Sequence, residues 1–457
     1  MFKSITIENF KSFKDEQKIN LAPITLLYGP NSSGKSSIIQ MLMLTRETLK
    51  SRTLHAAPVF SSDNFDLGSY STVVHKHDLD KDIHVTIEYN STIDAQEHIL
   101  KTSNKPIFGN HDIRKLDLTY SSYEDKNRSI DYLSSLSFSC CQNRSQHELV
   151  SFIIKNRKEK RFGLERESTF YIDNDGQDKL RKFIYSRISK TNSSISESQL
   201  IRALSEDLNL SPDINLPIYS IFQDGGEHLN YIFSQIFSES KFKLDDIKYL
   251  GPLRSPPKRF YSSINDGEKN IALKLSSDNG YLIEKINFWF DKFEIPYTLS
   301  VEEIGNSVTG RILSIQLIDR RTETIVTPAD VGFGIGQVLP IIIESVVNKN
   351  ATICVEQPEI HLHPRLQAHL ADLFIESIKN KNQWIIETHS EALLLRLQRR
   401  IRNKSNEINN ESVIVSYVNC DKSGARVTEL KMDSDGDFLV HWPDGFFEER
   451  LVEQFGK

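Results

Sequence analysis

The residues best suited to do chemistry form a glycine- and serine-rich segment at positions 29–36, which reads Gly-Pro-Asn-Ser-Ser-Gly-Lys-Ser. This segment, called the P-loop below, matches in full the phosphate-binding pattern G-x-x-x-x-G-K-[ST]. In such a loop the backbone N–H groups surround a polyphosphate, the lysine reaches the β- and γ-phosphate oxygens, and the next hydroxyl binds Mg²⁺. We therefore predict that Lys35 contacts ATP and that Ser36 is a magnesium ligand.

The flanking residues supply the elements that such a loop needs. An apolar run at Ile24–Tyr28 predicts a buried strand, and an amphipathic stretch from Ser37 to about Leu49 predicts a helix. A loop between them lies at a helix N-terminus, whose positive end favours phosphate. A serine-rich turn that matches by chance is the alternative, but it leaves the order of strand, loop and helix unexplained. The predicted nucleotide-binding residues here are Gly29, Pro30, Asn31, Ser32, Ser33, Gly34, Lys35, Ser36 and Ser37.

A second group of reactive residues follows the apolar run Ala351–Val355, which predicts another buried strand. Glu356 ends this strand, and a carboxylate beside the P-loop strand can hold the water shell of a magnesium ion, which is the Walker B role. We predict that Glu356 is a magnesium ligand and a catalytic residue. A further predicted strand at Gln383–Glu387 precedes His389, a candidate contact to the γ-phosphate; a structural histidine is the alternative.

A third segment has glycines in front of an apolar stretch. Residues 330–337 read Asp-Val-Gly-Phe-Gly-Ile-Gly-Gln, and we predict an apolar helix from Val338 to about Val347. Glycines before a helix expose backbone N–H groups to an anion. Residues 330–337 are called the signature segment below. Its predicted nucleotide-binding residues are Gly334, Gly336 and Gln337.

Taken in order, these segments resemble the head of ABC-type ATPases, with a P-loop, a signature, a Walker B strand and a switch histidine. The resemblance implies an α/β fold, namely an ABC/SMC-like P-loop ATPase head with a mixed sheet. In such heads the signature of one subunit closes over the triphosphate bound to another, which implies a homodimer or higher homo-oligomer. The resemblance also makes Gln357 a catalytic-site residue, at the position where these ATPases usually carry a glutamate.

The chain more specifically resembles the branch of these ATPases that is related to the overcoming-lysogenisation-defect (OLD) proteins, called OLD-like below. Anti-phage defence ATPases such as the Septu ATPase PtuA and the ATPase of the PARIS system belong to this group, and they act beside a separate effector. The resemblance therefore implies an effector partner, an HNH or Toprim-like nuclease or a toxin. The matching stretches are Asn9–Phe13, Pro23–Leu27, the P-loop, Tyr249–Arg254, Val331–Pro340, Glu356–Pro364, Glu387–Glu391 and a C-terminal module with Trp442-Pro443-Asp444-Gly445-Phe446-Phe447.

The same motifs suggest how the chain is organised. We predict the first part of the ATPase head at 1–98, a compact inserted α+β domain at 99–246, the second part of the head at 247–430 and a small module at 431–457. The insertion has candidate strands at Leu149–Lys155 and Thr169–Ile172 and candidate helices at 179–189, 197–208 and 227–236. It lacks sustained heptads, which argues against a coiled-coil arm.

Two departures from the family pattern bear on the rate of ATP hydrolysis. Gln357 carries an amide, which is not a usable base, and Gly336 stands where related signatures often carry a serine. We therefore expect slow hydrolysis or binding without hydrolysis. The alternative is that Glu359 or Glu387 supplies the base.

Composition further narrows the class of protein to which the chain can belong. The chain has 457 residues, a formal net charge of -6 and four cysteines without metal-ligand spacing, so we expect a reduced, cytoplasmic protein without a membrane span. DNA is a further candidate partner through Lys155–Arg161 and Arg396–Lys404, although a solvated or partner-binding face is favoured. The alternative function is an SMC-like DNA-repair head acting directly on DNA. The acidic residues at 433–437 predict a solvated turn rather than a nuclease site, and His361 and His363 are not expected to bind metal.

Overall fold

The computed structural model describes residues 1–50, 57–62, 65–90, 112–125, 128–142, 148–159, 163–172, 239–254, 259–262, 271–278, 280–304, 312–403 and 408–443. The chain divides into two compact units. The first comprises Met1–Leu21, Asn31–Ile247 and Val418–Val427, and the second comprises Ala22–Pro30, Lys248–Tyr417 and Thr428–Lys457. Each unit is described by itself.

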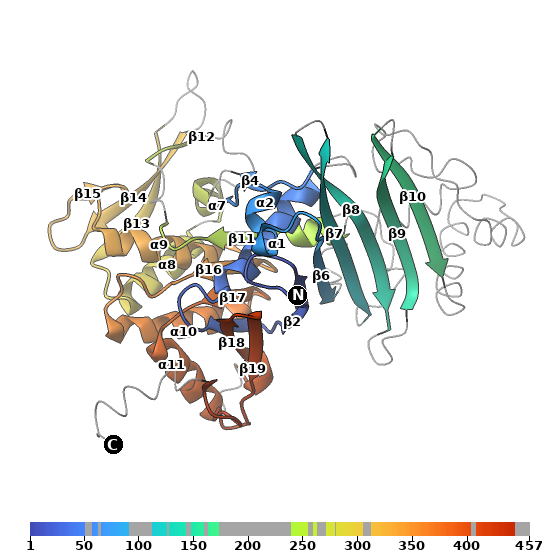
Figure 1. Ribbon diagram of the computed structural model, residues 1–457. Helices are drawn as coiled ribbons and strands as arrows, with labels where there is room; N and C mark the ends of the chain where they lie inside the picture. The colour runs from blue at the N-terminus through green and yellow to red at the C-terminus, as the bar shows by residue number, and fades with distance from the viewer. Residues whose placement is uncertain are drawn as a thin grey trace, which may run out of the picture. The chain divides into compact units, whose positions relative to one another are not determined.

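The first unit is built on an antiparallel sheet. Its described strands lie in the order β10-β9-β8-β7-β6-β1-β2, and Figure 1 shows β7, β8, β9 and β10 as long strands running side by side. Alternate residues of β6 are buried, which gives this strand one core face. The bounds are β1 (Phe2–Glu8), β2 (Gln17–Asn20), β4 (Ser61–Ser62), β5 (Phe65–Asp66), β6 (Ile83–Asn90), β7 (Ile113–Asp125), β8 (Arg128–Cys141), β9 (Glu148–Glu159), β10 (Gly163–Ile172), α1 (Lys35–Lys50), α2 (Tyr70–Val73) and the 3-10 turn η1 (His75–His77).

The strands predicted in the 99–246 insertion are present as parts of β9 and β10. They continue the sheet that β6 belongs to, through β7 and β8. The helices predicted at 179–189, 197–208 and 227–236, and the boundary at 98/99, lie outside the described residues. The predicted domain division therefore stays a prediction.

The second unit holds most of a sheet whose strands lie in the order β11-β16-β17-β3-β18-β19. The pairs β16–β17, β17–β3 and β3–β18 are parallel, and every residue of β3, β16 and β17 is buried, as the apolar sequences predicted. The bounds are β3 (Ile24–Tyr28), β11 (Ile247–Leu250), β16 (Thr352–Glu356), β17 (Gln383–Glu387), β18 (Val413–Asp421) and β19 (Gly424–Leu430).

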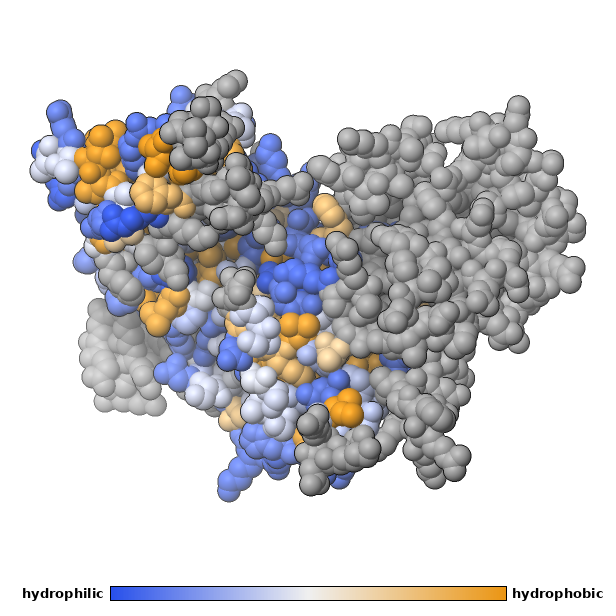
Figure 2. All heavy atoms as spheres, turned by 90° about the horizontal axis from the view of Figure 1, so that it is seen from above, coloured by the Kyte–Doolittle hydropathy of each residue, from blue (hydrophilic) through white to orange (hydrophobic). Residues whose placement is uncertain are grey.

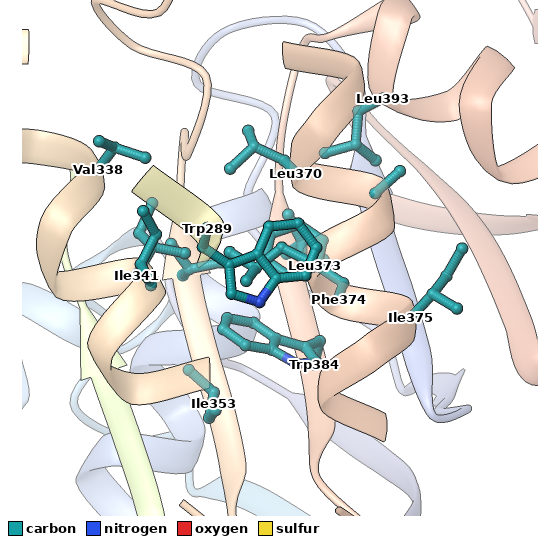
Figure 3. Close-up of a cluster of buried hydrophobic side chains, with 14 of the residues drawn as sticks. Trp289, Val338, Ile341, Ile353, Leu370, Leu373, Phe374, Ile375, Trp384 and Leu393 are labelled. Carbon is teal, nitrogen blue, oxygen red and sulfur yellow. The ribbon is translucent and has the colours of Figure 1, made fainter. Parts of the chain in front are cut away.

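Helices and a smaller antiparallel sheet complete the second unit. Val338 and Ile341 of α9 and Ile353 of β16 belong to one buried apolar cluster, which Figure 3 shows. In the same cluster Phe374 of α10 packs on Trp384 of β17, with ring centroids 4.4 Å apart. The bounds are α7 (Ile271–Ser277), α8 (Tyr281–Lys292), α9 (Phe333–Val347), α10 (Pro364–Ile378), α11 (Glu391–Arg402), β12 (Tyr261–Ser262), β13 (Tyr297–Glu303), β14 (Ile312–Asp319), β15 (Ile325–Val326) and the 3-10 turn η4 (Asn410–Ser412).

The predicted start of α9 was wrong. The helix begins at Phe333 rather than at Val338, so Gly334 and Gly336 lie inside its first turns instead of in front of it. The helix start was predicted too late because glycine weakens helices and Pro340 lacks a backbone donor. In the structure Gly332 caps the helix, and the Gly336 N–H bonds to the Gly332 carbonyl at 3.2 Å.

The described surface is mixed in character. On the face that Figure 2 shows, hydrophilic and hydrophobic side chains alternate in small groups. Within the part of the chain that the structure describes, every helix is too short or too polar to cross a bilayer.

Candidate nucleotide-binding site

The P-loop backbone requires glycine. Gly29, Ser32 and Gly34 have φ angles of 142°, 61° and 111°, in the region that side chains disfavour. A Cβ on Gly34 would lie 2.3 Å from the Ser12 hydroxyl oxygen and 3.4 Å from the Phe13 ring. Only glycine fits at position 34 without a shift in these neighbours.

The loop opens directly onto α1, as predicted. Lys35 is the first helical residue and is 3% exposed, and the first turn of α1 contains no acidic residue. The buried hydroxyl of Ser33 has no hydrogen-bond partner. A helix N-terminus without a competing carboxylate, next to a buried lysine and an orphaned hydroxyl, is a fitting environment for phosphate oxygens.

The second unit brings several predicted site residues to one edge of its sheet. Parallel pairing places Glu356 opposite Glu387, and Glu387 opposite Leu27 of β3. The Gln357 N–H donates to the Glu387 carbonyl at 2.7 Å, which ties the end of β16 to the end of β17. Gly29 follows β3 at this same edge. The Walker B residues, the switch strand and the start of the P-loop therefore meet where parallel strands commonly bind ligands.

Glu356 is held by Tyr249 of β11 and by Arg254, which follows this strand. Glu356 is 6% exposed. Its carboxylate accepts a hydrogen bond from the Tyr249 hydroxyl at 2.9 Å, while its main-chain oxygen accepts one from the Arg254 guanidinium. Burial and the neighbouring Glu356 raise the pKa of Tyr249 far above its usual range, so this phenol stays a donor. A buried carboxylate so held is oriented to hold a cation.

Glu359 connects the Walker B loop to the switch loop. One carboxylate oxygen accepts from the Thr388 hydroxyl at 2.8 Å, and the other accepts from the His389 N–H at 2.7 Å. Burial raises the pKa of Glu359 despite these bonds and despite the nearby positive charge of Arg254. Glu359 thereby fixes the backbone that carries His389, whose ring is half-buried.

The signature residues have different roles in the structure. A Cβ on Gly334 would lie 3.2 Å from the His361 carbonyl, whereas a Cβ on Gly336 would meet nothing within 4 Å. Gln337 is 2% exposed, and its amide makes two hydrogen bonds to the main chain of Arg254. Its predicted contact to nucleotide stays a prediction, because its amide is already engaged within the unit.

Sequence reasoning missed Tyr249 and Arg254 as site residues. The stretch from Tyr249 to Arg254 was noticed only as part of a resemblance, since neither residue type at that spacing signals a particular chemistry. Arg254 is 5% exposed although its neighbour Leu253 is 76% exposed, and burial lowers the pKa of its guanidinium to about 10. Both exposures are known only from the structure, so the sequence holds no signal that would have singled out Arg254.

Several of the remaining candidates have local partners. Arg396 and Arg400 on α11 pair with Asp372, and Arg402 pairs with Asp437. His363 caps α10, its Nδ1 accepting from the Arg365 N–H at 3.2 Å. No group of three His, Cys, Asp or Glu side chains placed to hold a metal occurs among the described residues.

The acidic cluster near the C-terminus folds as the predicted turn. The Asp433 carboxylate accepts from the N–H groups of Asp435 and Asp437, at 2.8 and 3.0 Å. Trp442 of the C-terminal module packs edge-on against Tyr28, with ring centroids 5.5 Å apart. The module therefore contacts the strand residue directly before the P-loop; residues 444–457 lie outside the described residues.

Comparison with known proteins identifies the family. A family model described as an AAA ATPase domain matches residues 1–394, and a second, described as a protein of unknown function (DUF3696), matches residues 408–453. A search of curated proteins found no match.

Among solved structures the chain is similar to SMC heads. These are an SMC head bound to the C-terminal winged-helix domain of ScpA (12% identity, 94% of this chain and 98% of that chain, TM-score 0.45), one from Pyrococcus furiosus with an extended coiled coil (12%, 100% and 99%, 0.43) and one from Thermotoga maritima (12%, 94% and 99%, 0.36). The predicted α/β P-loop ATPase fold is confirmed by the match over residues 1–394 together with the strand, loop and helix of the P-loop. The chain belongs to the AAA ATPase domain family.

Proposed function

We propose that this protein is an ABC/OLD-like ATPase that binds ATP tightly, hydrolyses it slowly and controls a separate effector in anti-phage defence. The observation that carries the proposal is Gln357. It directly follows the buried Glu356, and its N–H is bonded to the Glu387 carbonyl. An amide cannot take a proton from the attacking water, and a missing general base slows a reaction by about 10²–10⁴-fold. A slow ATPase serves best as a switch whose ATP-bound state persists.

The chain offers ligands for magnesium and triphosphate. Gly34 has no room for a side chain, and the first turn of α1 is free of acidic residues, both of which suit a phosphate group. Ser36 and Glu356 would hold the magnesium ion, which neutralises phosphate charge when bound. Lys35 and the P-loop N–H groups bind and orient the phosphates. His389 is positioned by Glu359 to respond to the terminal phosphate.

The signature segment supports assembly into a homodimer. Gly334 packs against the His361 carbonyl, so the start of α9 and the loop after β16 form one continuous surface. In the ATPases that this chain resembles, such a surface closes over the nucleotide of a second copy. ATP then acts as a bridge between two chains.

A separate effector follows from what the described residues lack. They contain no cluster that could serve a metal-dependent nuclease. In the acidic turn at 433–437 the Asp433 carboxylate accepts from two backbone N–H groups, and the Asp437 carboxylate pairs with Arg402. Direct action on DNA is less well supported, because Arg396 and Arg400 are paired with Asp372. We therefore favour an HNH or Toprim-like nuclease, or a toxin, as the regulated partner.

The test combines mass and turnover on the purified protein. Light scattering with and without Mg²⁺–ATP should show ATP-dependent association, and phosphate release should be slower than about one per minute. Lys35→Ala should abolish both. Rapid turnover, or an unchanged mass in saturating ATP, would contradict the proposal. Co-purification with the product of a neighbouring nuclease gene would identify the effector, and a steep loss of DNA binding with salt would instead favour the DNA-acting alternative.

A further inference from the structure

We propose that Arg254 is a positioning residue that couples the signature segment on α9 to the Walker B residue Glu356 within the same chain. The inference deepens the proposed function and rests on it, because it names the element through which nucleotide state would be passed between the two motifs. It concerns residues of the second unit only.

The first link joins α9 to Arg254. The Arg254 N–H donates to the Gln337 side-chain oxygen at 3.0 Å, and the Gln337 amide donates back to the Arg254 carbonyl at 2.9 Å. One amide side chain thus makes both hydrogen bonds of a backbone-like pair across 83 residues of sequence. The pair is buried at both ends, so breaking it leaves polar groups without partners, at a cost of about 1–3 kcal/mol each.

The second link joins Arg254 to the end of β16. Its guanidinium donates to the main-chain oxygen of Glu356, and more weakly to the Gln337 carbonyl at 3.5 Å. The same guanidinium therefore contacts both the first turns of α9 and the Walker B residue. Tyr249, five residues earlier, holds the Glu356 carboxylate itself at 2.9 Å. The segment from Tyr249 to Arg254 therefore holds both the main chain and the side chain of Glu356.

The electrostatics of Arg254 argue against a purely structural role. Among the described residues no carboxylate forms an ion pair with it, and its Nε has no hydrogen-bond partner. Burial lowers the pKa of the guanidinium to about 10, so the charge is retained at neutral pH at an energetic cost. An apolar side chain would fill the space without that cost. An apolar side chain could not replace the two guanidinium donors, which bond to the main-chain oxygens of Gln337 and Glu356.

The hydrogen bonds of Arg254 link the movement of Glu356 to the movement of the first turns of α9. Val338 and Ile341 of α9 share the buried apolar cluster of Figure 3 with Ile353 of β16, which holds the body of α9 in the core. The start of α9 is held by the Gln337–Arg254 hydrogen bonds and by the close approach of Gly334 to the His361 carbonyl. When a ligand moves Glu356, the first turns of α9 must follow, and a partner that moves the signature segment must displace Glu356 in return.

Hydrogen–deuterium exchange on the full chain tests the coupling. With wild type, a non-hydrolysable ATP analogue and Mg²⁺ should slow exchange at the P-loop (29–36) and at the start of α9 (333–339). The measurement is made at dilutions where light scattering shows monomer. Arg254→Met should keep the P-loop protection and lose at least two thirds of the α9 protection. Gln337→Met should lose the α9 protection to the same extent. Arg254→Lys, which keeps one donor, should restore part of it.

The controls separate this inference from the proposed function. Arg320→Met removes an exposed arginine that pairs with Asp291 and should behave as wild type. If wild type shows no protection at the P-loop, the proposed function fails. If the P-loop is protected and α9 protection is unchanged in Arg254→Met and Gln337→Met, the coupling role alone fails. Should Arg254→Met not fold, the same comparison between Gln337→Met and Arg254→Lys decides, and additive losses in the double variant Arg254→Lys/Gln337→Met would also contradict a single relay.

Discussion

The Tyr249 hydroxyl donates a hydrogen bond to the Glu356 carboxylate at 2.9 Å, across 107 residues of sequence. Both groups lie at the end of neighbouring strands, β11 and β16, in one sheet. The pairing gives the predicted Walker B carboxylate a fixed orientation before any nucleotide arrives. It also gives the proposed magnesium site a supporting residue that can be removed without touching a ligand.

Tyr249→Phe should weaken the use of magnesium. Removing a hydrogen bond to a metal-ligating carboxylate typically costs 10–100-fold in metal affinity. We expect the Mg²⁺ concentration that half-saturates ATP binding to rise about tenfold, while ATP binding in EDTA changes less than about twofold. Equilibrium binding of a fluorescent ATP analogue measures both. Tyr281→Phe, at an exposed tyrosine of α8, is the matched control, and an equal response of the two variants would rule out the support role.

Gln357→Glu should speed hydrolysis. A carboxylate at this position restores a general base, which is worth about 10²–10⁴-fold in rate. Phosphate release under saturating Mg²⁺–ATP measures the change, and the combined variant with Lys35→Ala should be inactive. A rate that stays within a factor of about two of wild type would mean that Glu359 or Glu387 already supplies the base.

Gly34→Ala should destabilise the protein, whereas Gly336→Ala should not. The new Cβ at position 34 would lie 2.3 Å from the Ser12 oxygen in a left-handed backbone, which by itself costs about 1–2 kcal/mol. At position 336 the Cβ has open space within a helix, where alanine is favoured by about 0.5–1 kcal/mol. Urea unfolding gives both values. Equal stability of the two variants would show that the P-loop does not need glycine at 34.

Glu359 predicts a pH dependence with a definite sign. Because burial raises the pKa of Glu359, the folded state holds its proton to higher pH than the unfolded state does. The contribution of this residue to the free energy of unfolding therefore falls as pH rises from about 4.3, the ordinary glutamate value, toward its raised folded value. In Glu359→Gln this fall should vanish, so the stability of the variant relative to wild type should increase over that range. Urea unfolding from pH 4 to pH 7 measures the difference, and a constant difference would contradict the shift.

The sequence predicted the strands around the site well because their signal is local. Ile24–Tyr28 and Gln383–Glu387 are short apolar runs, and both are strands with every residue buried. The P-loop backbone also followed from its residues, since glycines sit where φ is positive.

The contacts that orient Glu356 could not be predicted from sequence. Tyr249, Arg254 and Gln337 meet Glu356 or one another across 83 to 107 residues, and no local pattern records such pairings. The same limit hid the way in which β7–β10 extend the sheet of β6, because strand order depends on non-local pairing. The start of α9 was placed too late because its glycines weaken the local helix signal while tertiary contacts to Arg254 and His361 hold the turn.

The proposed function requires that each chain binds a single nucleotide through the P-loop lysine and that Glu356 holds its metal ion. Isothermal titration of the full chain with a non-hydrolysable ATP analogue and Mg²⁺ tests it directly. The account predicts one site per chain, undetectable binding in Lys35→Ala, and at least tenfold weaker binding in Glu356→Gln only when Mg²⁺ is present. Absence of binding to wild type at millimolar analogue, or binding that Lys35→Ala leaves intact, would contradict it.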